Sequence, residues 1–196
     1  MSNRDTALPA ILLIGHGSRL ASGIAEFQRL AEQLQSALPE RTCVAGFLEL
    51  AKPSLPEALE QLYQQGFRQI TAIPALLLAA GHVNRDIPNI LSDFQANHPQ
   101  VTIIFGAELG LHANLLEIAR ERIESAELDF GATYQRQETL LLVIGRGSSD
   151  PEANAKLCQI ADQLGETLGF GGVETAYTAV ARPSIVDALA QESLLG

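Results

Sequence analysis

Gly15-His16-Gly17-Ser18-Arg19 follows the apolar run Ile11-Leu12-Leu13-Ile14 and precedes a segment with helical periodicity. This order predicts a strand, a tight turn and a helix, with His16 at the tip of the turn. In an open α/β sheet such a tip lies at the carboxyl end of a strand, where these folds bind ligands. The stretch therefore indicates the fold class and provides the first candidate functional residue.

Apolar runs alternate with amphipathic segments along the rest of the first half of the chain. The pattern predicts strands over 44–50, 69–74 and 101–105, and helices over 22–38, 54–65, 88–96 and 111–127. Ser54 and Glu57 form a capping-box pattern at the start of the second helix. Because the elements alternate and the loops are short, we expect a parallel sheet flanked by helices on both faces.

Part of the first half of the sequence is repeated later in the chain. Corresponding residues are 130 positions apart, so that residue 15 corresponds to residue 145. Among the residues kept at this shift, Gly15, Gly17 and Ser18 fall on Gly145, Gly147 and Ser148, and Pro53-Ser54 falls on Pro183-Ser184. We predict a first domain over 1–128, a linker over 129–138 and a partial second repeat over 139–196.

The second copy reaches only the counterpart of Gly66, so it holds two strands and two helices where the first copy holds four of each. Two strands and two helices leave apolar faces uncovered. We therefore expect either that the chain is part of a longer protein, or that the half-unit completes itself on the first domain or on a second chain, as in a homodimer.

The composition narrows the function classes. The chain has 196 residues, 46% of them hydrophobic, and a net charge of −10, which predicts an ordered globular protein. The acidic charge and the lack of a basic stripe argue against nucleic acid as a partner. The apolar run over 9–14 is too short for a secretory signal or a membrane span, and the two cysteines show no metal or disulfide pattern. We expect a cytoplasmic protein that does not act at a membrane.

His16 follows the first predicted strand, Glu49 stands at the end of the second, and His82 lies in the loop after the third, at intervals of 33 residues (16 to 49, 49 to 82). Since parallel strands end at one edge of the sheet, these groups can converge there as ligands of a borderline divalent metal. Each histidine alone also fits an ordinary loop residue. The second copy keeps the glycines but has Arg146 and Ala179 in place of His16 and Glu49, so the exchanged residues are those that the scaffold does not need.

Three motifs in this order resemble the sirohydrochlorin chelatase family, the class II chelatases of the CbiX/SirB type. They are Leu13-Ile14-Gly15-His16-Gly17-Ser18-Arg19, Phe47-Leu48-Glu49-Leu50-Ala51-Lys52-Pro53-Ser54, and the segment from Pro74 to His82 with Asp86-Ile87-Pro88 after it. The resemblance covers essentially the whole chain, because Gly145-Arg146-Gly147-Ser148 is similar to the second half of the longer, duplicated members.

The resemblance implies a flavodoxin-like α/β architecture with two lobes and a tetrapyrrole in the cleft between them. It implies insertion of Co²⁺ or Fe²⁺, or Ni²⁺ in some members, without ATP or another organic cofactor. It also implies that the metal-binding histidines are His16 and His82, and that their acidic partner is Glu49.

Metal insertion into a tetrapyrrole releases two pyrrole protons, so the site needs a base as well as metal ligands. Neutral imidazole can fill both roles, and a carboxylate can orient it or ligate the metal beside it. The substrate carries eight carboxylates, which arginine and lysine would bind. The substrate-binding candidates are Ser18, Arg19, Lys52, Arg85 and Arg146, and each cation also fits an ordinary solvated charge.

Two other functions fit parts of the pattern. A histidine between glycines after a strand also resembles the nucleophilic histidine of phosphoglycerate-mutase-like phosphatases, although Gly15 stands where that chemistry has an arginine. A non-catalytic tetrapyrrole or metal carrier would use the same ligands and release the metal unchanged. A turnover assay separates these alternatives.

Overall fold

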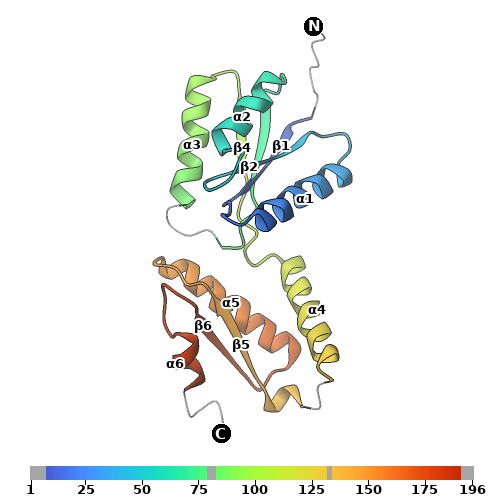
Figure 1. The fold of residues 1–196 in the computed structure, drawn as a ribbon, viewed down its shortest axis with the longest axis vertical. Coiled ribbons are helices and arrows are strands. Elements are labelled where there is room, and N and C mark those ends of the chain that lie inside the picture. The colour runs from blue at the N-terminus through green and yellow to red at the C-terminus, as the bar shows by residue number, and fades with distance from the viewer. Residues whose placement is uncertain (1–7, 79–82, 132–133, 191–196) are drawn as a thin grey trace. The chain divides into compact units, whose positions relative to one another are not determined.

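The apolar strand β1 (Ala10–Gly15) is buried along its whole length at the centre of a four-stranded sheet (Figure 1). The structure is a computed structural model that describes residues 8–78, 83–131 and 134–190. The sheet has the order β2-β1-β3-β4, with β2 (Cys43–Phe47), β3 (Gln69–Pro74) and β4 (Thr102–Phe105), and all its pairs are parallel. The predicted parallel sheet is confirmed, and the loops after β1, β2 and β3 leave it at the same edge.

Helices α2 (Leu55–Gln64) and α3 (Val83–Asn97) cover one face of this sheet, and α1 (Ala21–Ala37) covers the other (Figure 1). The main core lies under α2 and α3, where strand and helix side chains are almost completely buried: Leu12, Ile14, Leu55, Leu59, Leu62, Ile87 and Leu91. On the α1 side, the rings of Phe27 and Phe47 lie 5.1 Å apart, centroid to centroid. These contacts fix the register of β1, and with it the position of the turn that follows.

Two boundaries differ from the sequence prediction by three residues or more. Helix α3 begins at Val83 and carries Pro88 inside it, whereas the prediction started this helix at Pro88. Proline is favoured at a helix start, but inside a helix it removes one hydrogen bond, which the buried Ile87 and Leu91 offset here. Strand β2 ends at Phe47, three residues earlier than predicted, because the chain then turns across the end of β1.

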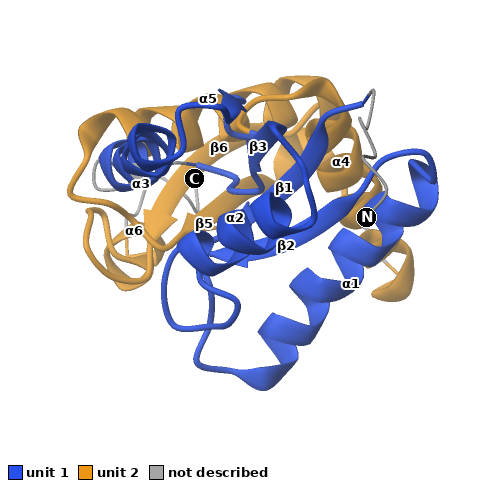
Figure 2. Cartoon of the chain, turned by 90° about the horizontal axis from the view of Figure 1, so that it is seen from above, with its two compact units in different colours: residues 1–109 blue, residues 110–196 orange. Residues whose placement is uncertain are grey.

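The second compact unit spans residues 110–196 and the first spans residues 1–109 (Figure 2). In the second unit β5 (Leu140–Gly145) pairs in parallel with β6 (Gly172–Tyr177), and α5 (Pro151–Leu168) and α6 (Ile185–Leu189) pack on them. Helix α4 (Ala113–Asp129) packs against α5 and so belongs to this unit. The division of the repeat at residues 128 and 139 stays a prediction about the sequence copies. Across the described ranges, no helix combines the length and the apolar character that a membrane span needs.

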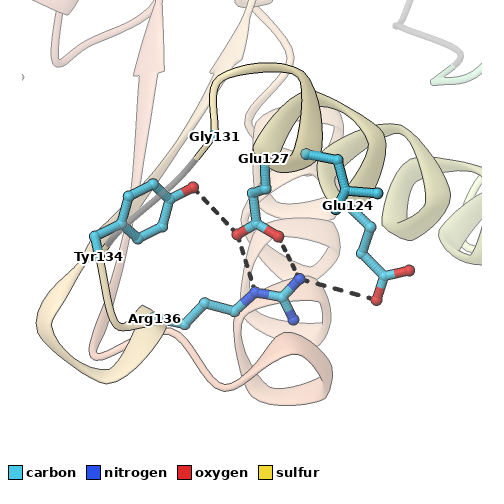
Figure 3. Close-up of a pocket in the computed structure, with 6 residues that line it drawn as sticks. Glu124, Glu127, Gly131, Tyr134 and Arg136 are labelled. Carbon is cyan, nitrogen blue, oxygen red and sulfur yellow. Dashed lines mark hydrogen bonds and ion pairs between the residues drawn. The ribbon is translucent and has the colours of Figure 1, made fainter.

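Arg136, in the segment predicted as a linker, binds the ends of two helices, and Figure 3 shows its contact with Glu127 on α4. Its Nε donates to Glu127 Oε1 at 2.9 Å, its Nη1 donates to the Leu168 carbonyl at 3.2 Å, and its Nη2 also pairs with Glu127. Tyr134 donates its hydroxyl to the same carboxylate at 3.2 Å. The Arg136 guanidinium holds the pKa of Glu127 below its ordinary value. Residues 134–138 are therefore attached to the helices that flank them.

Candidate functional site

The turn after β1 is joined to the loop after β2 by backbone hydrogen bonds. The Leu48 and Glu49 amides donate to the Gly15 and His16 carbonyls at 2.9 and 3.0 Å. Gly17 has a φ of 95°, and a Cβ at this position would lie 1.8 Å from the Glu49 carbonyl oxygen. Only glycine fits this approach, since another residue would clash with rigid backbone and strain the left-handed conformation. The glycine predicted for the turn therefore brings Glu49 next to His16.

His16 Nε2 lies 3.2 Å from Glu49 Oε1, with the two side chains 35% and 50% exposed. Two neighbouring ligands of one divalent ion, each about 2.1 Å from it, would be about 3.0–3.4 Å apart for octahedral to tetrahedral angles. The observed separation lies within this range. In the metal-free protein, a neutral imidazole with its proton on Nε2 would donate to the carboxylate and keep its lone pair on Nδ1. The pair is thus spaced either to hold one ion or to fix a tautomer.

A hollow of about 370 Å³ opens beside Glu49 and is lined by Leu48, Glu49, Asp86, Asn89 and Ile90. On α3, Asn89 and Ile90 lie three and four positions after Asp86, so both neighbour it on one side of the helix. Leu48 and Ile90 also pack on the main core, so the hollow is lined by both apolar and polar side chains. Sequence reasoning missed Asp86 and Asn89 as lining residues, although Asp86 stands in one of the quoted motifs.

His82, the third predicted ligand, lies outside the described residues, so its approach to His16 and Glu49 stays a prediction. In the described part of the chain, no cluster of three or more His, Cys, Asp or Glu side chains has the geometry of a metal site. The structure brings together two members of the predicted trio.

Two substrate-binding candidates have structural contacts that recur in the second copy. Ser18 Oγ accepts from the Leu20 amide at 3.0 Å, and Ser148 Oγ accepts from the Asp150 amide at the same distance. Lys52 pairs with Glu57 at the start of α2, and their counterparts Arg182 and Asp187 pair at 2.7 Å. The second copy forms the same bonds although Arg146 and Ala179 replace His16 and Glu49 there. Ser18 and Lys52 therefore stabilise their loops whether or not the site residues are present.

The remaining candidates are exposed arginines. Arg19 and Arg146 form no ion pair within the described residues, and both lie in the turns that follow β1 and β5. Arg85 is exposed in the first turn of α3. These guanidinium groups are accessible to an anionic ligand.

The second copy repeats the hydrogen bonds of this turn without the predicted ligands. The Thr178 and Ala179 amides donate to the Gly145 and Arg146 carbonyls at 2.9 and 3.1 Å, and Gly147 has a φ of 86°. The turn is therefore built in the same way in both copies, while the side chains at its tip differ.

The chain is similar to a known protein family and to relatives that have names. The profile of the CbiX family matches residues 10–126 and 140–195, within the two copies of the repeat. The chain is 32% identical over 182 residues to the sirohydrochlorin ferrochelatase of Priestia megaterium, a match that covers 93% of this chain and 66% of that protein. It is 32% identical over 181 residues to the sirohydrochlorin cobaltochelatase of the same organism, covering 91% and 57%. The chain thus spans less than two thirds of the length of these curated relatives.

Two solved structures are also similar to this chain. SirB from Bacillus subtilis with Fe³⁺ superposes with a TM-score of 0.82 at 28% identity, covering 93% of this chain and 70% of that one. The SirB sirohydrochlorin chelatase from Bacillus subtilis subspecies spizizenii in complex with cobalt superposes with a TM-score of 0.74 at 26% identity, covering 86% and 66%. The predicted class II chelatase fold is confirmed.

Proposed function

The chain belongs to the CbiX family, and on this premise we propose that it inserts Co²⁺ or Fe²⁺ into sirohydrochlorin. The observation that carries the proposal is the separation of His16 Nε2 and Glu49 Oε1, 3.2 Å, at the carboxyl edge of the sheet. Imidazole and carboxylate are suitable ligands for these divalent ions. The relatives named as ferrochelatase and cobaltochelatase support the same reaction.

In the proposed reaction the ring loses two N–H protons and the metal gains four ring nitrogens, with no change of oxidation state. His16 and Glu49 hold the metal on one face of the ring, and His82 is the third proposed ligand. One of these groups accepts the pyrrole protons, a role for which imidazole suits near neutral pH. The reaction as written needs no organic cofactor, and Ni²⁺ is a further proposed metal because the ligand set suits it equally.

The carboxylates of the substrate are proposed to bind to exposed arginines. Arg19 lies three residues after His16, and Arg146 takes the place of His16 in the second copy. Arg85 lies on α3, the helix that lines the hollow beside Glu49. Bidentate guanidinium–carboxylate pairs would orient the ring over the metal site. Lys52 and Ser18 have smaller proposed roles, because their contacts stabilise loops.

Further expectations complete the proposal. The protein is proposed to act in the cytoplasm on its small-molecule substrate, without a nucleic-acid or membrane partner. A homodimer is proposed because β5 pairs with β6 alone within the described residues, while its counterpart β1 pairs on both sides. Sedimentation at micromolar concentration tests this expectation, and a monomer would contradict it.

An anaerobic absorbance assay tests the function. Catalytic amounts of the chain are added to sirohydrochlorin with Co²⁺ or Fe²⁺, and the spectrum of the metallated ring is followed. We expect turnover by the wild type, loss of turnover in the double variant His16→Ala with His82→Ala, and unchanged turnover in the control His112→Ala. A rate for the double variant equal to the wild-type rate would contradict the assignment of these residues. Stoichiometric binding without turnover would indicate a carrier, and hydrolysis of a phosphate monoester would indicate the phosphatase.

A further inference from the structure

Three large leucine side chains are exposed in the loops that leave the sheet at the same edge as the His16–Glu49 pair. Leu20 follows β1 and is 70% exposed, Leu50 follows β2 and is 50% exposed, and Leu77 follows β3 and is 51% exposed. The three strands are neighbours in the sheet, and their loops leave it at one edge. A single exposed leucine is ordinary, but three in the loops of neighbouring strands, at the edge that carries the His16–Glu49 pair, suit an apolar ligand.

Leu50 is held in an unfavourable backbone conformation directly beside Glu49. Its φ is 63°, and it is the only non-glycine with positive φ in the described part of the chain. The second copy does not share this feature, because its counterpart Val180 has no positive φ. Such strain persists where surrounding contacts impose it, and it gathers at ligand sites.

The contacts of the two turn glycines show how the loops differ. The atom nearest to a Cβ at Gly17 is the Glu49 carbonyl oxygen, whereas the atom nearest to a Cβ at Gly147 is the Ala181 amide nitrogen. The peptide between Glu49 and Leu50 therefore presents its carbonyl to the turn in the first copy. The left-handed conformation of Leu50 accompanies this arrangement, in the copy that carries the His16–Glu49 pair.

We propose that Leu20, Leu50 and Leu77 form an apolar rim on which the flat face of the tetrapyrrole rests, with Leu50 as the main contact. The inference rests on the proposed function, which supplies the tetrapyrrole as the ligand. A tetrapyrrole is an apolar disc with carboxylates at its edge. The rim offers aliphatic side chains next to the metal ligands, and the exposed Arg19 beside Leu20 matches the anionic edge of the disc. Leu50 is then a substrate-positioning residue.

The test uses metal-free sirohydrochlorin, so that ring binding is measured apart from metal insertion. We expect Leu50→Ala and Leu50→Gly each to weaken ring binding by about tenfold, the effect of losing one buried leucine side chain. Both variants should bind Co²⁺ as the wild type does in the absence of the ring. Leu50→Gly should unfold at a higher temperature than Leu50→Ala, because glycine adopts positive φ without strain. Leu30→Ala, which removes an exposed leucine from α1, is the matched control and should bind the ring normally.

The results separate this inference from the proposed function. Wild-type ring affinity in both Leu50 variants, or an equal loss of ring affinity in Leu30→Ala, would contradict the proposed contact between the rim and the ring. A loss of Co²⁺ affinity in parallel with ring affinity would also overturn it, because Leu50 would then act by holding Glu49. A wild-type chain that binds the ring but inserts neither metal overturns the chelatase function and leaves the rim supported by the binding data. A wild type that does not bind the ring overturns both.

Discussion

The turns after β1 and β5 share their hydrogen bonds and differ in chemistry. Each has a glycine in the left-handed region, a serine that accepts from the amide two residues on, and two hydrogen bonds to the loop after the next strand. At the tip, His16 faces Glu49 in the first copy, and Arg146 with Ala179 replaces them in the second. The comparison separates the residues that build the turn from those that give it a function.

The two copies also differ in burial. Ile14 in β1 is 0% exposed because strands flank β1 on both sides, whereas its counterpart Ile144 in β5 is 50% exposed. Leu59 in α2 is likewise buried, and its counterpart Leu189 in α6 is exposed. The same apolar sequence pattern is therefore covered in the first copy and uncovered in the second, within the described residues. The first copy carries a complete α/β core beneath its site, and this supports precise placement of His16 and Glu49.

The largest expected effect comes from exchanging the residue at the tip of each turn for alanine. His16→Ala removes a metal ligand and should lower kcat/KM for metal insertion by about 10²–10⁴-fold. Arg146→Ala removes one carboxylate partner and should raise KM for the tetrapyrrole by about tenfold while kcat changes little. Steady-state kinetics with varied metal and varied ring measure both. Equal losses of kcat in the two variants would mean that the copies share the chemistry.

A second comparison concerns the glycines that both turns require. In Gly17→Ala the new methyl group would meet the Glu49 carbonyl oxygen at 1.8 Å, and in Gly147→Ala it would meet the Ala181 amide nitrogen at 2.7 Å. We expect a loss of unfolding free energy of about 2–4 kcal/mol for Gly17→Ala and about 1–2 kcal/mol for Gly147→Ala. Urea denaturation measures the difference. Only Gly17→Ala should also weaken Co²⁺ binding, since it displaces Glu49, and a similar loss in Gly147→Ala would contradict the separate roles of the turns.

Much of this fold could be predicted from the sequence, because strand–turn–helix order and a register-matched repeat constrain a parallel sheet strongly. The spacing of His16 and Glu49 predicted their convergence for the same reason. Other features depend on three-dimensional contacts that no local pattern encodes. The left-handed Leu50 follows from the passage of its loop over Gly17, and the bond from Arg136 to the Leu168 carbonyl joins residues 32 positions apart. The start of α3 was placed too late because proline is a stronger signal for a helix start than for a helix interior.

Installing the ligands of the first copy in the second copy tests whether the shared turn can place them. In Arg146→His with Ala179→Glu, the backbone bond between the two positions, 3.1 Å long, matches the bond of 3.0 Å between His16 and Glu49. We expect the imidazole and the carboxylate to meet, and the Co²⁺ stoichiometry in isothermal titration to rise by one equivalent, with weaker affinity at the new site. Arg146→His alone is the control and should not add an equivalent. An unchanged stoichiometry in the double variant would show that the scaffold of the second copy does not place ligands.

The smallest expected effect concerns the capping boxes that both copies share. Hydrogen bonds from Lys52 and Ser54 lower the pKa of Glu57 to about 2, and hydrogen bonds from Ser184, together with Arg182, lower the pKa of Asp187. A carboxyl whose pKa is lower in the folded state stabilises the protein above its unfolded pKa, and this contribution is lost as the pH falls through the folded pKa. Between about pH 4.5 and 2, unfolding of Glu57→Gln should therefore take up about one proton fewer than unfolding of the wild type. Unfolding of Asp187→Asn should also take up fewer protons. The pH dependence of the urea midpoint measures this proton uptake. Because these boxes belong to the scaffold, both variants should keep wild-type Co²⁺ affinity at neutral pH. A change in Co²⁺ affinity for Glu57→Gln alone would mean that loss of the helix cap alters the metal site through the loop between Glu49 and α2. The residues that build the first copy and those that give it a function would then be less separate than the two turns indicate.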